Sequence, residues 1–163
     1  MVVLTEGYYI IKLGLLRVTI SYRMERNRSL EFFIGGLISF IFVAQIVALA
    51  YFLYWEFWWF DIVMHFLGGL FVGLLATYLY YHSRFIEPKH FSFIFILLLS
   101  LGASALIGVL WELFEFASDQ FAISIGRRIE LQQEFQDTLG DLFFDLIGAF
   151  VGALMYKTLW RKK

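Results

Sequence analysis

Residues 60–81, FDIVMHFLGGLFVGLLATYLYY, decide the fold class of this chain, because they form a continuous apolar run that still contains Asp61 and His65. The run is long enough for the ~20 residues that a membrane-spanning helix needs. Its apolar residues are consecutive and do not alternate with period two, which excludes a strand of a membrane barrel. The stretch therefore predicts a spanning helix with two ionisable side chains in its first turns.

Three further apolar stretches have the same character, and they lie at residues 32–54, 91–116 and 137–160. With residues 60–81 they predict an all-α membrane protein, a bundle of four transmembrane helices. The composition agrees, because 61% of the 163 residues are hydrophobic and 21% are aromatic. A soluble domain of this size does not need so much apolar surface.

Residues 1–30 form a basic segment ahead of the four-helix transmembrane domain at residues 31–163. Apolar residues recur in it at helical spacing, at Leu4, Tyr8, Ile11, Leu15, Val18 and Tyr22. This spacing, interrupted by basic residues, predicts an amphipathic helix that lies on the cytoplasmic leaflet. The alternative is a basic tail without regular structure that only fixes the topology.

The basic residues indicate how the chain is oriented in the plasma or inner membrane. They concentrate in the N-terminal segment, in the link 82–90 and at the C-terminus: Lys12, Arg17, Arg23, Arg26, Arg28, Arg84, Lys89, Lys157, Arg161, Lys162 and Lys163. The turn 55–59 has none, and its three tryptophans are typical of an outer aromatic belt. By the positive-inside rule, both termini are expected in the cytoplasm.

With this topology, the ionisable residues of the spans all fall near the outer face. They are Asp61, His65, Glu112, Glu115, Asp137, Asp141 and Asp145. Residues three or four apart share a face of a helix, so each span presents its polar groups together. Such groups are costly in hydrocarbon and usually line a site or a pathway. The sequence therefore predicts one acidic pocket that opens outward.

Small residues continue two of these polar faces. Gly148 and Gly152 follow Asp145 on the last span, and Gly69 and Gly73 follow His65 on the second. Glycines four apart let two helices approach closely. We therefore expect these two spans to pack against each other, with the polar groups at the outer end of their contact.

So many carboxylates in one pocket need either shared protons or a bound cation. Carboxylates with one imidazole suit Mg²⁺, Mn²⁺, Fe²⁺ or Zn²⁺, and the absence of cysteine excludes thiolate ligands. The candidate metal ligands are His65, Glu112, Glu115 and Asp141, and the candidate catalytic proton acceptors are Asp61 and Asp145. Alternatively, Asp61 and Asp137 serve only as helix N-caps.

Three motifs carry a family resemblance: Asp61-x-x-x-His65, Trp111-Glu112-x-x-Glu115 and Asp137-Thr138-x-x-Asp141-x-x-x-Asp145-x-x-Gly148-x-x-x-Gly152. They resemble the YjdF-like inner-membrane proteins of bacteria and archaea and, more distantly, the VanZ-like family. Glu115 stands where the VanZ pattern has Gln, Asp145 where it has Asn, and Ile62 where it has Lys. The resemblance implies a small polytopic membrane protein with a more acidic site, and no particular reaction.

Three functions fit these observations. The first is a metal-dependent hydrolase, or an enzyme that modifies lipids or envelope precursors at the outer leaflet, with residues 117–136 as a lid. The second is an accessory or structural subunit that binds a membrane-protein partner. The third is transport of protons or divalent cations. The bilayer is the expected environment in each case, and the net charge of -1 gives no reason to expect nucleic-acid binding.

Overall fold

The computed structural model describes residues 2–5, 8–13, 16–21, 28–82, 92–126 and 135–160 of the chain. Four long helices dominate it: α1 (Arg28–Tyr51), α3 (Phe60–His82), α4 (Phe93–Ser124) and α5 (Phe135–Met155). A short helix α2 (Leu53–Glu56) follows α1, and a π-helical turn η2 (Tyr156–Trp160) follows α5. All four long helices are long and apolar enough to cross a membrane. The predicted bundle of four transmembrane helices is therefore confirmed.

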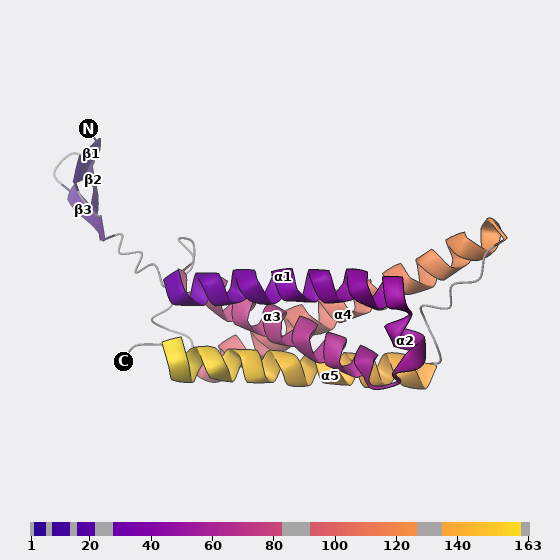
Figure 1. The fold of residues 1–163 in the computed structure, drawn as a ribbon. Coiled ribbons are helices and arrows are strands. Elements are labelled where there is room, and N and C mark those ends of the chain that lie inside the picture. Colours follow the sequence, from indigo (N-terminus) through magenta and orange to yellow (C-terminus); the bar gives the residue numbers. More distant parts are fainter. Residues whose placement is uncertain are drawn as a thin grey trace.

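The helices run alternately in opposite directions, as Figure 1 shows. The start of α1 and the turn η2 consequently lie at one end of the bundle, while α3 and α5 begin at the other. At the end near η2, residues from α1, α3 and η2 form an apolar core of Leu30, Ile34, Leu70, Leu74 and Tyr156. This core holds α1 and the C-terminal turn against the middle of α3.

Helix α4 is longer than the sequence predicted. The apolar run ends near Phe116, but the helix continues to Ser124, into the segment 117–136 that is expected to form a lid. No glycine or proline interrupts residues 117–124, and Ser118 and Ser124 donate hydrogen bonds to backbone carbonyls of their own helix. Gly126 follows with φ 74°, the left-handed conformation that commonly ends helices. Residues 127–134 of the expected lid lie outside the described residues.

The amphipathic helix predicted for the N-terminal segment is wrong for the residues that the structure describes. Three strands, β1 (Val2–Thr5), β2 (Tyr8–Leu13) and β3 (Leu16–Ser21), pair there as an antiparallel sheet in the order β1-β2-β3. Thr5 pairs with Tyr8 and Leu13 with Leu16, so each connection has only two residues.

The reason for this outcome is present in the sequence. Residues 16–21, LRVTIS, alternate apolar and polar side chains with period two, and the whole segment is rich in β-branched and aromatic residues. Each two-residue connection contains a glycine, which is typical of hairpins. Apolar residues are so frequent in this segment that they also matched helical spacing.

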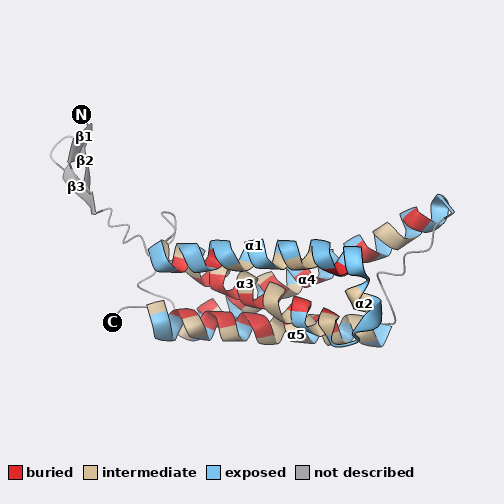
Figure 2. Ribbon diagram, in the orientation of Figure 1, coloured by how far each residue is buried: buried red, intermediate tan, exposed pale blue. Residues whose placement is uncertain are grey.

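The predicted glycine contact between α3 and α5 is confirmed, and it is the closest approach in the bundle. A methyl group added to Gly69 would collide with the backbone carbonyl of Asp145, and one added to Gly148 would collide with that of Phe66. Further along the same contact, a methyl group on Gly152 would lie 2.6 Å from the Leu70 carbonyl oxygen. Figure 2 shows the buried residues concentrated on α3 and α5, whereas α1 is mostly exposed.

This contact predicts the effect of Gly148→Ala. The new methyl group would meet the Phe66 carbonyl oxygen and lie 2.7 Å from the Leu70 amide nitrogen, so the two helices must separate. We expect a loss of about 1–3 kcal/mol in stability, as in other overpacked interiors. Thermal unfolding in detergent, followed by circular dichroism, measures it.

Gly140→Ala on the same helix is the matched control, because no atom lies within 4 Å of its added methyl group. It should leave stability unchanged or raise it, since alanine has the higher helix propensity. Equal losses in the two variants would contradict a role for the glycine contact.

Candidate functional site

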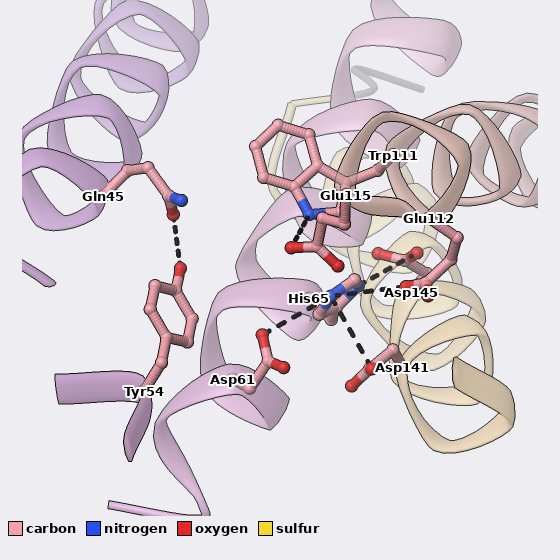
Figure 3. Close-up of polar contacts among 9 residues, drawn as sticks. All are labelled: Gln45, Tyr54, Asp61, His65, Trp111, Glu112, Glu115, Asp141 and Asp145. Atoms are coloured by element: carbon pink, nitrogen blue, oxygen red, sulfur yellow. Dashed lines mark hydrogen bonds and ion pairs between the residues drawn. The ribbon is translucent and has the colours of Figure 1, made fainter. Parts of the chain in front are cut away.

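Ionisable side chains from three helices meet at the end of the bundle where α3 and α5 begin (Figure 3). Helix α3 supplies Asp61 and His65, and α4 supplies Glu112 and Glu115. Helix α5 supplies Asp141 and Asp145, and all six side chains are buried. The alternating helix directions bring them together, because the cluster lies near the starts of α3 and α5 and in the second half of α4.

Neither Asp61 nor Asp137 is the residue that caps its helix. Helix α3 begins at Phe60 and α5 at Phe135, so both aspartates lie inside the first turn. The interpretation of these residues as N-caps is therefore wrong. Asp61 is free to face the neighbouring helices instead, and Asp137 lies half-buried one turn outward from Asp141.

His65 lies at the centre of the cluster and faces carboxylates with both ring nitrogens. Nδ1 lies 3.4 Å from Oδ2 of Asp145. Nε2 lies 3.6 Å from Oδ1 of Asp61, 3.8 Å from Oε1 of Glu112 and 4.0 Å from Oδ2 of Asp141. One nitrogen therefore has a single carboxylate partner, while the other faces three carboxylates from three different helices.

Glu112 is the least satisfied member of the cluster. Glu112 is only 6% exposed, and its Oε1 has no hydrogen-bond partner among the residues described. A buried acceptor without a partner costs about 1–3 kcal/mol, and a charged one costs more. This oxygen is also the atom that approaches Nε2 of His65. A cation between the two groups would remove the cost.

Asp61, His65 and Asp141 each offer one ligand atom, and these atoms lie within 4.8 Å of one another. Around an ion with bonds of about 2.0–2.2 Å, neighbouring ligand atoms are roughly 3–3.4 Å apart. The Nε2–carboxylate distances of 3.6, 3.8 and 4.0 Å are slightly longer. The donor atoms of Asp61, His65 and Asp141, which lie within 4.8 Å of one another, would therefore have to move closer together to coordinate an ion, and Glu112 would have to move with them.

Glu115, a candidate ligand in the sequence, lies beside this group of donors. Its carboxylate accepts a hydrogen bond of 2.9 Å from the indole Nε1 of Trp111, one turn earlier on α4. No ion pair between Glu115 and His65 occurs within the described part of the chain. The indole is partly exposed, so Trp111 separates the buried carboxylate from the surroundings of the bundle.

Tyr54 and Gln45 border the cluster on the side of α1, and sequence reasoning gave neither a place at the site. Phe52, with φ 57°, turns the chain after α1 so that α2 carries the Tyr54 hydroxyl back to donate to Oε1 of Gln45. Burial, and then the negative charge of Asp61, raise the pKa of this hydroxyl, which keeps it a donor. Nothing in the sequence distinguishes Tyr54 from the other aromatic residues of this turn.

The fold and the cluster together define a polytopic membrane protein whose helices enclose a histidine ringed by carboxylates. The chain belongs to the family described as "Predicted membrane protein (DUF2238)", whose model matches residues 3–163. An uncharacterised protein of Thermotoga maritima is 28% identical over 167 residues, which cover 99% of this chain and 79% of the relative. No solved structure matches. The family agrees with the resemblance to YjdF-like proteins, and the VanZ-like relationship stays a prediction.

The crowding of negative charge predicts the effect of Glu112→Gln in a chelating buffer. Without a cation, replacing one buried carboxylate by a neutral amide relieves the repulsion among the carboxylates of the cluster. We expect the melting temperature to rise by about 2–4 °C, the shift that 1 kcal/mol causes in a chain of this size. Thermal unfolding in EDTA at neutral pH measures this.

Glu56→Gln is the control, because this carboxylate on α2 is exposed and lies outside the cluster. The Glu56→Gln variant should have the same melting temperature as wild type. If Glu112→Gln lowered the melting temperature in EDTA, then Glu112 would already be stabilised within the protein.

Proposed function

We propose that this protein is a metal-dependent membrane enzyme that hydrolyses or otherwise modifies lipids or lipid-linked envelope precursors. The metal ligands would be Nε2 of His65 and the carboxylates of Asp61, Glu112 and Asp141. One observation carries the proposal: three buried carboxylates face a single imidazole nitrogen, and one of them has no hydrogen-bond partner among the described residues. This donor set suits Mg²⁺, Mn²⁺, Fe²⁺ or Zn²⁺.

In this proposal Asp145 contacts His65 and is not a metal ligand. Its Oδ2 lies 3.4 Å from Nδ1, so this carboxylate would hold the proton on Nδ1 and leave the lone pair of Nε2 for coordination. Histidine ligands commonly donate their second ring N–H to a carboxylate in this way. The arrangement gives Asp145 a positioning role, where the sequence had made it a candidate proton acceptor.

Glu115 is the carboxylate best placed for proton transfer. It is buried beside the cluster, and Trp111 fixes its orientation without any need for coordination. A divalent ion in the site would supply Lewis acidity and lower the pKa of a bound water. Glu115 would serve as the general base of the site, because a positioned carboxylate beside the reacting groups can accept a proton during hydrolysis.

The proposed substrate follows from where the site lies. The basic residues favour cytoplasmic termini, so the opposite end of the bundle, with the cluster, would face outward. Large apolar side chains on α4 next to the cluster are exposed, among them Leu113 and Phe114. A substrate with a lipid tail could contact these side chains while its polar part enters the cluster.

Elemental analysis of the purified protein tests the metal site. Wild type, purified without chelators, should contain close to one divalent ion per chain. Asp141→Asn and His65→Ala should lose it, because each removes one of the proposed ligands. Inductively coupled plasma mass spectrometry gives the stoichiometry and identifies the metal.

His82→Ala and Glu56→Ala are the matched controls, because each removes a residue of the same chemistry outside the cluster. Both should keep the metal. A wild type that binds none, even after incubation with Mn²⁺ or Zn²⁺, would overturn the proposal and favour an accessory subunit. If the metal is present, lipids in nanodiscs are the first substrates to screen, with Glu115→Gln as the inactive variant.

One observation favours a second candidate, proton or divalent-cation transport. Hydroxyl groups continue from the cluster toward the other end of the bundle. Ser104 Oγ donates a hydrogen bond to the backbone carbonyl of Asp145, and Thr77 Oγ1 lies 3.0 Å from Ser100 Oγ. The side chains of Thr77, Ser100 and Ser104 are all buried. Uptake of protons or divalent cations into proteoliposomes by wild type, and its loss in Thr77→Val, would favour transport. If wild type shows no uptake, the result favours the enzyme.

A further inference from the structure

One face of α4 contacts the Asp145–His65 pair on three successive turns. Ser104, Gly108 and Glu112 are spaced four residues apart, so they share this face, and all three are buried. Ser104 Oγ donates to the backbone carbonyl of Asp145 at 3.0 Å. Glu112 approaches Nε2 of His65 at 3.8 Å. Between them, Gly108 lies directly against the carboxylate of Asp145.

A side chain at Gly108 would occupy the space of that carboxylate. An added methyl group would collide with Oδ2 of Asp145, the oxygen that faces Nδ1 of His65, and would lie 3.3 Å from its Cγ. It would also lie 2.9 Å from Cδ2 of Leu142. The end of the Leu142 side chain can rotate away. The conflict with Asp145 is harder to relieve.

The backbone of Asp145 is held from two sides, so it cannot retreat from α4. Its carbonyl accepts the hydrogen bond from Ser104 on α4 and packs against Gly69 on α3, where an added methyl group would collide with it. On its other side, Oδ1 of Asp145 would lie 3.8 Å from a methyl group at Gly68, which is ordinary contact. A larger residue at Gly108 would therefore turn the carboxylate away from Nδ1.

We propose that Gly108 is a positioning residue: its missing side chain lets Asp145 reach Nδ1 of His65 and so directs Nε2 toward the metal. This inference rests on the metal site proposed above. Without Asp145, the ring loses the partner that selects its tautomer and orientation. The three carboxylates would then face a nitrogen that carries a proton in part of the molecules.

The first experiment compares Mn²⁺ affinity of wild type, Gly108→Ala and Gly102→Ala by isothermal titration calorimetry in nanodiscs. Gly102 is the matched control on the same helix, because no atom lies within 4 Å of its added methyl group. We expect Gly108→Ala to weaken binding by about 10–100-fold, the usual effect of losing a partner of a histidine ligand. Gly102→Ala should bind as wild type does.

A double variant separates positioning from simple packing. Asp145→Ala empties the space that the new methyl group needs, so Gly108→Ala should cause no further loss of Mn²⁺ affinity in that background. It should also recover melting temperature relative to Gly108→Ala alone. A further loss of affinity in the double variant would overturn the proposal, because Gly108 would then act through Leu142 or through helix packing.

Nitrogen-15 NMR of labelled histidine tests the same idea without any metal. In EDTA, wild-type His65, assigned by its absence in His65→Ala, should show an Nδ1–H proton shifted downfield by its hydrogen bond to Asp145. Gly108→Ala should lose this downfield shift, and Gly102→Ala should match wild type. Identical His65 signals in all three proteins would overturn the positioning role. Failure of wild type to bind Mn²⁺ would instead overturn the metal site, so the two failures are distinguishable.

Discussion

The close contact of α3 with α5 organises both the helix bundle and the cluster around His65. Gly69 and Gly73 face Gly148 and Gly152 across it, and any larger side chain at Gly69 or Gly148 would meet the backbone of the opposite helix. Lipid is as apolar as the helix surfaces, so helices in a membrane associate through such close packing and hydrogen bonds. The contact also brings His65 beside Asp145, about one helical turn before the glycines of α3 and α5. The same packing therefore forms the bundle and the site.

The second constraint is electrostatic. Asp61, Glu112, Asp141 and Asp145 surround a single imidazole, and burying charges without compensation is costly. A protein selected only for stability could replace these groups by apolar residues. The metal ion of the proposed function would supply the positive charge that this arrangement of four carboxylates around His65 needs.

Much of the fold and of the site could be predicted from the sequence, and the failures have physical causes. Apolar run length predicts where the spans lie, but α4 extends beyond its run to Ser124, because polar residues such as Ser118 and Gln120 can also be part of a helix. Residues 16–21 alternate apolar and polar side chains, as a strand does, and they form a strand. The segment is so rich in apolar residues that it also matches the spacing of a helix. Glu115 lies on the face that the spacing predicts, and its hydrogen bond to Trp111, four residues away, orients its carboxylate. The spacing of residues along one helix does not show which hydrogen bond each side chain forms.

The apolar runs alone specify a bundle of membrane helices, because hydrocarbon thickness and backbone hydrogen bonding leave few other structures for runs of this length. The sequence also determined which side chains gather at one end, since spacing and helix direction fix their level in the membrane. Only the tertiary structure decided the partner of each atom. That Asp145 faces Nδ1 while Glu112 and Asp141 face Nε2 depends on how α3, α4 and α5 pack, and these helices are distant in sequence.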